Sequence, residues 1–529
     1  MDFALYDYII VGAGSAGCVL ANRLSADPGR RVLLLEAGPR DWHPFIHMPA
    51  GIAKLVGQKG VNWDYSTEPE ANLGGRRLWW PRGKVLGGSS SINAMCYIRG
   101  HHRDYDEWAA LGASGWDWDS VLPYFKRAEH NERGADAFHG IGGSLNVDDL
   151  RHHNPLSDVF LAATAQAGFP ANRDFNGAAQ DGFGYYQVTQ KDGARCSTAA
   201  GYLTPVRGRE NLVIKTGALA RRVLIEDGRA VGVEYAHRGT TVRAEAAREV
   251  ILAGGALNSP QLLMLSGIGP ADALRGHGIA VALDAPDVGR NLHDHLDACT
   301  IVHCTQPVTY DRTNDLAVAW NYYLHRRGIG TSNVAETGGF VRSPLAEDQR
   351  PDIQFHFVPA MLEDHGRQRL PGHGYTLHAC QLRPRSRGHL ALASADPAAK
   401  VRIHANYLGD PEGYDLKVLV EAVRLSRRIL AQDAFRAWRG DEIFPGASAQ
   451  DETALADFVR RRAETIYHPV GTCRMGSDQR AVVDPQLRVR GVSALRVVDA
   501  SVMPRLVGGN TNAPTVMIAE RASDLILAA

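Results

Sequence analysis

The sequence predicts a mixed α/β protein, α+β overall, in which a Rossmann-like domain carries a second domain inserted into its chain. Residues 8–11 form a short β-branched run, a glycine turn follows, and residues 15–24 show apolar side chains at helical spacing. Residues 31–36 (RVLLLE) have the pattern of a second buried strand, which completes the start of a βαβ unit. A strand at 495–501, a glycine-rich loop and a helix at 514–527 end the chain. We therefore expect both ends of the chain to build one domain.

The middle of the chain supplies the rest of this prediction. Residues 212–216, 221–225, 230–235 and 241–245 have the spacing of a β-meander, and residues 249–253 form another buried strand that ends in glycines. The region from about 300 to 450 is less regular and rich in histidine and aromatic residues. We expect it to form most of the inserted domain.

Length, charge and cysteine content fit a two-domain protein without a metal centre. With 529 residues the chain is too long for one ordinary core. Basic and acidic residues are equal at 58 each, so the charge gives no reason to expect nucleic acid as a partner. The seven cysteines are scattered and form no CxxC pair, which argues against a disulfide framework or a zinc site and fits a reducing compartment.

Two further features bear on location. The N-terminal residues lack the basic segment of a signal peptide, and no apolar stretch reaches transmembrane length. We expect a cytoplasmic protein that lies at most peripherally on the cytoplasmic face of a membrane.

A glycine turn near the N-terminus predicts nucleotide binding. Gly12, Gly14 and Gly17 form GxGxxG between a strand and a helix. Glycines permit a tight turn and a close approach of the backbone to a pyrophosphate, and the helix that begins at Ser15 offers amide donors. Glu36 ends the second strand, nineteen residues after Gly17, where a carboxylate can accept a hydrogen bond from a ribose 2′-hydroxyl. This motif alone does not separate FAD from NAD.

Longer segments carry a more specific signal. Residues 83–93 (GKVLGGSSSIN) and 255–269 (GALNSPQLLMLSGIG) resemble the two signature patterns of the glucose–methanol–choline (GMC) oxidoreductase family. Further similar segments are 288–295 (VGRNLHDH), 468–476 (HPVGTCRMG), 498–501 (VDAS) and 508–515 (GGNTNAPT). The resemblance runs from residue 6 to 527.

The resemblance implies an FAD domain built from residues 1–160, 208–297 and 466–529. A substrate domain of antiparallel sheet and helices would take residues 161–207 and 298–465. It also implies cofactor contacts by position. The ADP half would meet Gly12, Gly14, Ser15, Gly17 and Glu36, with a backbone contact to adenine at Val223; the rest of FAD would meet Gly88, Ser89, Asn93, Ala94, Asp499, Ala500, Asn510 and Thr511.

Family members with histidyl-linked flavin carry histidine at the position of Ile92. Isoleucine has no nucleophile, so we expect non-covalent FAD.

The resemblance assigns the chemistry to two residues. His468 corresponds to the family's active-site histidine, and an imidazole near neutrality suits proton acceptance from an alcohol. Asn510 corresponds to the second active-site residue, whose amide can donate to the substrate oxygen. Asn512 is the rival for that role, although Asn512 and Thr515 could instead cap the C-terminal helix. Hydride transfer to flavin N5 would complete the oxidation.

Substrate and acceptor are less constrained. The runs 461–476, 331–336, 374–378 and 87–95 are most similar to FAD-dependent aliphatic alcohol dehydrogenases of alkane-degradation operons, which pass electrons from medium-chain primary alcohols to a quinone or dye. Choline dehydrogenase and polyethylene-glycol dehydrogenase share most of these motifs. Glu336 matches the position that holds the cationic head in choline-oxidising relatives, while a structural glutamate is the alternative. A lyase similar to flavin-containing hydroxynitrile lyases is the competitor from another class.

Overall fold

The first of two large sheets is assembled from both ends of the chain. A computed structural model describes residues 5–529. The strand order is β10-β2-β1-β13-β12-β11, with β24 beside β13. β10, β2, β1, the second half of β13 and β24 run parallel, as in a Rossmann-like domain, and the predicted fold class is confirmed. The bounds are β1 (Leu5–Val11), β2 (Val32–Glu36), β10 (Leu212–Thr216), β11 (Ala218–Glu226), β12 (Arg229–His237), β13 (Thr240–Leu252) and β24 (Leu495–Val497).

The predicted four-stranded meander is wrong in two respects. β10 is no part of it, because β10 pairs in parallel with β2, and Gly217 in the left-handed region (φ +64°) turns the chain into β11. The two strands expected at 241–245 and 249–253 are one strand, β13. Its first half pairs antiparallel with β12 and its second half parallel with β1. Apolar patterning predicted that these residues are extended, but it did not specify their partners.

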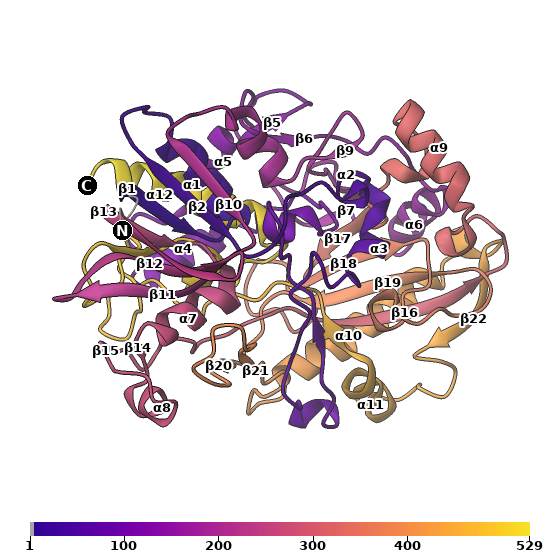
Figure 1. Ribbon diagram of the computed structural model, residues 1–529. Coiled ribbons are helices and arrows are strands. Elements are labelled where there is room, and N and C mark those ends of the chain that lie inside the picture. Colours follow the sequence, from indigo (N-terminus) through magenta and orange to yellow (C-terminus); the bar gives the residue numbers. More distant parts are fainter. Residues whose placement is uncertain (1–4) are drawn as a thin grey trace.

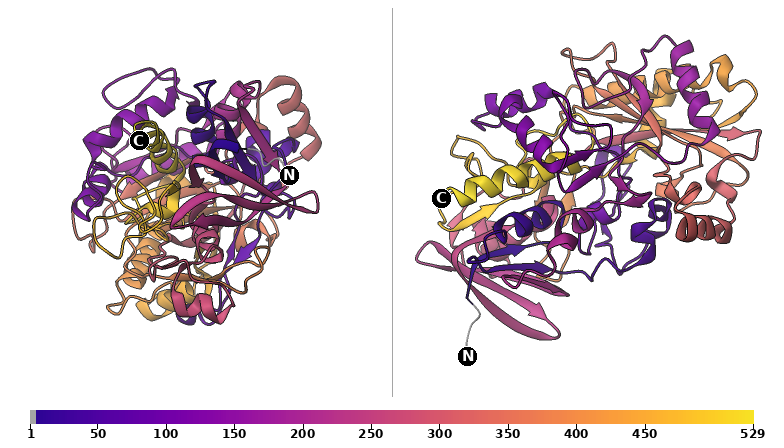
Figure 2. Two further views of the ribbon diagram at one scale, coloured as in Figure 1. Left: turned by 60° about the vertical axis from the view of Figure 1, so that its left-hand side comes forward. Right: turned by 90° about the horizontal axis from the view of Figure 1, so that it is seen from above.

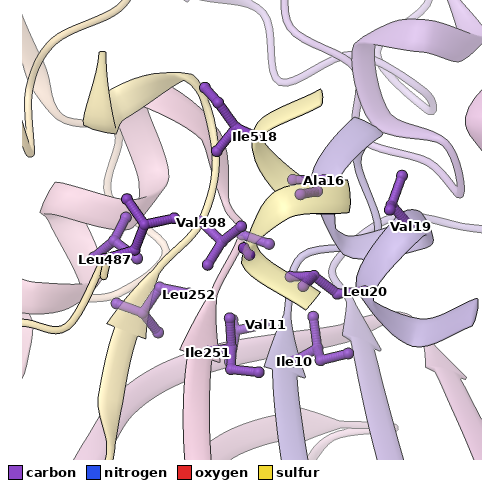
Figure 3. Packing of buried hydrophobic residues seen from close by; sticks show 14 of the residues in the cluster. Ile10, Val11, Ala16, Val19, Leu20, Ile251, Leu252, Leu487, Val498 and Ile518 are labelled. Atoms are coloured by element: carbon purple, nitrogen blue, oxygen red, sulfur yellow. The ribbon is translucent and has the colours of Figure 1, made fainter. Parts of the chain in front are cut away.

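Helices cover the parallel part of this sheet. α1 (Ser15–Leu24) and α12 (Asn512–Leu527) pack together although they lie at opposite ends of the sequence. Figure 3 shows Ile10 and Val11 of β1, Ala16 and Leu20 of α1 and Ile518 of α12 in one buried cluster. Each fully buried isoleucine or leucine side chain stabilises the fold by about 1.5–3 kcal/mol. This core therefore fixes the glycine turn between β1 and α1.

The second sheet is antiparallel and lies beside the first (Figure 1). Its order is β22-β16-β19-β18-β17-β7, with β23 (Glu464–Thr465) paired to β16. Two helices, α6 (Pro155–Gln166) and α10 (Tyr414–Leu430), share its core. The strands are β7 (Gly182–Tyr185), β16 (Leu296–Cys304), β17 (Thr337–Val341), β18 (Ile353–Val358), β19 (Gly374–Gln381) and β22 (Arg439–Phe444).

One predicted domain boundary needs correction. The boundary between residues 160 and 161 falls inside α6, and Leu156, Phe160 and Ala163 all belong to the core of the second sheet. This unit therefore begins no later than α6. The other boundaries stay predictions.

The remaining helices and short strands connect the strands of the two sheets, and Figure 2 shows the molecule from two further sides. Among the described residues, no helix combines the length and apolar character that a bilayer span requires. The helices are α2 (Pro44–His47), α3 (Ile52–Leu55), α4 (His102–Ala110), α5 (Trp118–Ala128), α7 (Gly255–Leu265), α8 (Ala271–Gly276), α9 (Asp315–His325) and α11 (Glu452–Arg462). Short strands pair as β3 (Tyr65–Ser66) with β4 (Trp79–Trp80), β5 (Glu129–Asn131) with β6 (Leu145–Val147), β8 (Gln190–Lys191) with β9 (Ala194–Arg195), β14 (Ile268–Gly269) with β15 (Leu283–Asp284), and β20 (His389–Ala391) with β21 (Arg402–His404).

Candidate active site

A cavity of about 470 Å³ lies between the two sheets. At one end it is lined by the carboxyl ends of β1, β2 and β13, through Val11, Glu36 and Leu252. At the other end it is lined by residues of the second sheet, including Asp297 and His356. Its volume is typical of a small-molecule or cofactor site. The nucleotide-binding motif and the predicted catalytic residues therefore open into one space.

The glycine turn between β1 and α1 leaves the backbone bare at this cavity. Gly12 is in the left-handed region (φ +102°), and a Cβ there would lie 2.5 Å from the carbonyl oxygen of Ala253. A Cβ on Gly17 would lie 1.8 Å from the carbonyl oxygen of Gly12. A Cβ on Gly14 would meet its nearest described protein atoms only at 4.0 Å, so the space beside Gly14 is open on the cavity side. This cradle fits the pyrophosphate of a dinucleotide.

A second glycine loop closes against the first. Gly88 is in the left-handed region (φ +54°), and a Cβ there would lie 2.7 Å from the Cα of Gly14. Gly88 begins a short 3₁₀ turn, and the hydroxyl of Ser89 accepts a hydrogen bond from the amide of Gly83 at 3.1 Å. Gly88 and Ser89 both line the cavity. Position 88 must therefore be glycine for the two loops to approach this closely, because a side chain there would meet the backbone of Gly14.

Glu36 holds the turn from the end of β2. Its carboxylate accepts hydrogen bonds from the amides of Ala13 at 2.9 Å and Gly38 at 2.8 Å. Burial raises the pKa of Glu36 to about 7, while those two amides oppose the shift. Glu36 also lines the cavity, in a position where it could accept a hydrogen bond from a ribose hydroxyl.

Asp499 plays a similar structural part at the start of α7. It accepts hydrogen bonds from the amide of Gly255 at 2.8 Å, the hydroxyl of Ser259 at 2.6 Å and the amide of Ser501 at 2.8 Å. These bonds place the N-terminus of α7 beside the cavity. Burial raises the pKa of Asp499 above its usual range.

The second glycine loop is held by an arginine, Arg195, which the sequence analysis did not single out. Arg195 is buried, and its guanidinium donates to the carbonyl of Asn93 at 2.6 Å, the side-chain oxygen of Asn93 at 2.8 Å and the carbonyl of Ile46 at 2.8 Å. Burial lowers its pKa to about 9, and within the described residues it forms no ion pair with a carboxylate. Arg195 therefore fixes Asn93, which lines the cavity next to Ala94.

The backbone of Val223, predicted to contact adenine, does not line the cavity. The amide of Val223 already donates to the hydroxyl of Ser266 at 2.8 Å, and Val223 does not line the cavity. Ala220, three residues earlier, does line it, at a bulge where the pairing of β11 with β12 shifts between Ala220 and Arg222. A bulge frees backbone groups from the ladder, so Ala220 is the better candidate for a backbone contact.

The tautomer of His468 follows from a chain of hydrogen bonds. His295 Nε2 lies 3.1 Å from the carbonyl oxygen of Leu382, which can only accept, so His295 carries its proton on Nε2. His295 Nδ1 is then an acceptor, and His468 Nδ1, at 3.0 Å, must donate to it. His468 Nε2 is left without a proton. Burial lowers the pKa of His295 to about 3 and, with His295 and His356 nearby, lowers the pKa of His468 well below its usual range. His468 therefore presents a neutral, proton-accepting nitrogen.

Asn510 lies at that nitrogen. Its side-chain amide Nδ2 donates to His468 Nε2 at 3.2 Å, and its oxygen accepts from Gln354 Nε2 at 3.0 Å. The second contact fixes which end of the Asn510 amide faces His468. His356, two residues after Gln354 on β18, also lines the cavity and lies 3.1 Å from the same Gln354 nitrogen. Sequence reasoning missed Gln354, His356 and His295, although His295 ends the segment 288–295.

Asn512 occupies a different place. Its side-chain oxygen accepts from the hydroxyl of Ser15 at 2.7 Å, which joins the start of α12 to the start of α1. It does not cap α12, because the N-cap is Thr511 and no side chain there accepts from the helix amides. The hydroxyl of Thr515 instead donates to the carbonyl of Thr511 at 2.7 Å. Asn510 thus lies at the catalytic histidine, and Asn512 lies at the start of α1 beside the glycine turn.

This separation gives a prediction. We expect Asn510→Ala to lower the rate of flavin reduction by about 10²–10³-fold at most, because it removes one donor at the site of developing charge. Asn512→Ala should instead weaken FAD binding and leave flavin reduction in the loaded enzyme within a few-fold of normal. Stopped-flow reduction and FAD titration measure the two effects. A larger loss of reduction rate in Asn512→Ala would show that the roles are reversed.

The prediction that Glu336 binds substrate is not supported. Glu336 is fully buried, and its carboxylate accepts hydrogen bonds from the hydroxyls of Ser157, Ser332 and Tyr310 and from the amide of Asn154. Its neighbour Ala335 lines the cavity, but Glu336 does not. Glu336 therefore belongs to a polar network outside the cavity, which was the alternative.

A polar wall faces the catalytic half of the cavity instead. Asp297 and Cys299 of β16 and His378 of β19 all line it. His378 Nδ1 lies 2.5 Å from a carboxylate oxygen of Asp297, and this carboxylate raises the pKa of His378 although burial opposes the shift. Buried Asp297 and half-buried His378 thus form a close pair in which the carboxylate favours the protonated imidazole. Glu464 also lines the cavity, and burial raises its pKa to about 7.

Ile92 lines the cavity and packs in an apolar cluster with Ile46, Leu55, Val61 and Val85. It offers no atom that could bond to a flavin. We therefore expect acid precipitation of the protein to release all FAD into the supernatant, measured by flavin absorbance. Flavin that stays with the pellet would show that another residue forms a covalent link.

Most of the predicted cofactor and catalytic residues surround the same cavity. Three do not line it: Val223, Glu336 and Gly17. Gly17 instead packs against the carbonyl of Gly12 on the side of the turn away from the cavity. The residues that line it are Gly12, Gly14, Ser15, Glu36, Gly88, Ser89, Asn93, Ala94, His468, Asp499, Ala500, Asn510 and Thr511.

Comparison with known proteins identifies the family of this chain. Two family models described as GMC oxidoreductase match residues 6–297 and 384–519. The chain is 52% identical to the alcohol dehydrogenase (acceptor) of Pseudomonas putida, over 99% of this chain and 96% of the relative. It is 48% identical to the mitochondrial choline dehydrogenase of Homo sapiens, over 98% of this chain and 89% of the relative.

Solved structures are similar over the whole chain as well. Pyridoxine 4-oxidase from Mesorbium loti is 35% identical with a TM-score of 0.90, and the match covers 98% of each chain. Formate oxidase from Aspergillus oryzae RIB40, a protein described for its FAD modification, has a TM-score of 0.93 at 27% identity, with 100% of this chain and 99% of the other covered. Because the family match covers most of the sequence and the glycine cradle fits a dinucleotide, the chain belongs to the GMC oxidoreductase family and its cofactor is FAD.

Proposed function

We propose that the protein oxidises primary alcohols to aldehydes and passes the electrons to a quinone or another non-oxygen acceptor. The unprotonated Nε2 of His468 is the observation that carries this proposal. The 52% identity to an alcohol dehydrogenase that uses an acceptor supports the reaction type. Medium-chain aliphatic alcohols are the substrate class that we propose.

The described residues supply the proton chemistry of this reaction. A substrate hydroxyl near His468 Nε2 can donate its proton there, and His295 Nδ1 accepts from the other side of the same ring. Asn510 Nδ2 donates at the same point and can stabilise charge that develops on the substrate oxygen. FAD, when bound, accepts the hydrogen of the alcohol carbon as hydride.

An anaerobic panel of alcohols tests the proposal, with flavin reduction as the measurement. We expect 1-alkanols to reduce the flavin, and kcat/KM to rise across short chains, because each buried methylene is worth about 0.8 kcal/mol. If no class of alcohol bleaches the flavin absorption, the dehydrogenase proposal fails and a lyase function is favoured. If oxygen reoxidises the flavin as fast as a quinone analogue does, the protein is an oxidase.

Choline-type alcohols are a second candidate, favoured by the acidic residues in the cavity wall. Asp297 and Glu464 both line the catalytic half, where a carboxylate could attract a quaternary ammonium group. Against this, His378 lies 2.5 Å from the carboxylate of Asp297 and offsets its charge when the ring is protonated, and burial raises the pKa of Glu464 to about 7.

A comparison of two substrates separates the candidates. If the second candidate holds, kcat/KM for choline exceeds that for 1-hexanol, and Asp297→Asn lowers it for choline while 1-hexanol is little affected. If 1-hexanol is the better substrate and choline is unaffected by Asp297→Asn, the aliphatic proposal stands.

A further inference from the structure

Helix α9 carries a ridge of exposed apolar side chains. Leu316, Trp320, Tyr323 and Leu324 are 82%, 65%, 43% and 58% exposed. Their spacing places them on one face of the helix. Of the ten large apolar side chains that are exposed between residues 5 and 529, these four fall within one eleven-residue helix. Single exposed apolar residues are common on protein surfaces, but a cluster of this kind marks an interaction surface. We refer to these four residues as the α9 ridge.

The charges around the α9 ridge are basic. Arg326 and Arg327 follow α9 directly, Arg312 precedes it, and all three are exposed. The exposed acid of the helix, Asp315, is paired with Lys54 at 2.5 Å. Apolar side chains with Trp, Tyr and Arg at their margin are typical of segments that lie in the interface of an anionic bilayer.

The α9 ridge lies beside the opening of the cavity. Lys54, the partner of Asp315, belongs to α3, and its neighbours Ile52 and Ala53 line the cavity. Ala53 is also exposed, so α3 stands at the opening. On the inner side of α9, the hydroxyl of Tyr322 donates to the carbonyl of His47 in α2 at 2.6 Å. α9 is thus tied to the wall of the cavity while its outer face is free.

The shape of the surface favours lipid over a protein partner. α9 lies at the periphery of the molecule in every view (Figures 1 and 2). A stable protein interface buries roughly 800 Å² per partner over a broad, complementary patch. Four side chains on one peripheral helix offer a narrow ridge instead, which can enter the headgroup region of a bilayer without a matching groove.

We propose that the α9 ridge docks on the surface of an anionic lipid bilayer and brings the cavity opening to the membrane. This proposal takes up the quinone named in the proposed function, because an acceptor dissolved in the bilayer would meet the cavity there. Vesicle binding tests it without any measurement of activity, so the two proposals can fail separately.

The test uses the purified holoenzyme and sedimentation with phosphatidylcholine vesicles, with and without phosphatidylglycerol. We expect the protein to sediment with the phosphatidylglycerol vesicles, and the double variant L316S/W320S to partition at least about ten-fold more weakly, because it removes the two most exposed apolar anchors. The matched control is Ile141→Ser, at another exposed apolar residue (60%), which should sediment like the wild type. Activity with a water-soluble dye should be the same in all three proteins.

Other results would overturn the proposal. The wild type could stay in the supernatant with anionic vesicles, or the double variant could sediment as the wild type does. Light scattering could also show a wild-type oligomer that L316S/W320S dissociates, in which case the α9 ridge is an interface between copies of this chain. Arg326→Ala should weaken binding to the anionic vesicles at low salt, and no salt dependence at all would exclude the charge contribution.

Discussion

His468→Ala should lower the rate of flavin reduction by alcohol by about 10²–10⁴-fold, because it removes a positioned proton acceptor. The variant should still bind FAD. His468 contributes its ring to the catalytic half of the cavity, while the glycine cradle at Gly12 and Gly14 lies at the other end. Anaerobic stopped-flow reduction measures the rate, and the flavin spectrum of the purified variant measures cofactor content. His468→Asn serves as a second variant of similar polarity. A reduction rate within ten-fold of the wild type would exclude His468 as the proton acceptor.

The pH dependence gives an independent check on the same residue. The pKa of His468 is held well below that of a free imidazole, so it stays neutral as pH falls through 6.5. Since a neutral ring is the accepting form, the reduction rate of the substrate-saturated enzyme should show no inflection near pH 6.5 that is lost in His468→Ala. Glu464 lines the same half of the cavity, and burial raises its pKa to about 7, so any inflection that it causes should remain in both proteins. An inflection there in the wild type that is absent in His468→Ala would mean that the ring titrates normally and that the hydrogen-bond chain through His295 does not hold it neutral.

The sequence predicted the architecture more reliably than the strand partners. Apolar runs and glycines located β1, α1 and β2 to within a few residues, because local periodicity determines which residues are extended or helical. The partner of β10 depends on where β2 lies in space, and the single long β13 depends on pairing with both β12 and β1. These are tertiary choices, and no local pattern encodes them.

The site shows the same limit at the level of single side chains. Motifs placed His468 and Asn510 correctly at the cavity, since both lie in segments whose resemblance is continuous. Glu336 was misplaced because resemblance gives a position in the chain and not the groups that the carboxylate contacts, which are hydroxyls and an amide outside the cavity. His295 and Gln354 act through other residues, so their importance appears only when hydrogen-bond partners are known.

Two glycine substitutions in the cradle should have large and distinguishable effects. At Gly14, a Cβ meets no described protein atom closer than 4.0 Å and the backbone is in an ordinary region (φ −78°), so Gly14→Ala should fold normally without FAD. The added methyl would occupy the space that the pyrophosphate needs, and we expect FAD binding to weaken by about 100-fold or more. At Gly17, the Cβ would lie 1.8 Å from the carbonyl oxygen of Gly12, so the turn itself must move.

Gly17→Ala should therefore lose both FAD binding and stability of the apoprotein, while Gly14→Ala should lose FAD binding and keep the stability of the apoprotein. FAD titration of the apoproteins gives the affinity, and thermal unfolding of the same samples gives the stability. Gly60→Ala is the matched control, because no described atom lies within 4 Å of its Cβ and its backbone is not left-handed. If Gly14→Ala binds FAD as tightly as Gly60→Ala does, the open space beside Gly14 is not the pyrophosphate site. Gly17→Ala could also equal Gly60→Ala in both FAD affinity and thermal stability. In that case the backbone moves to accept the methyl group near Gly12, and the close packing of α1 against the turn does not determine FAD binding.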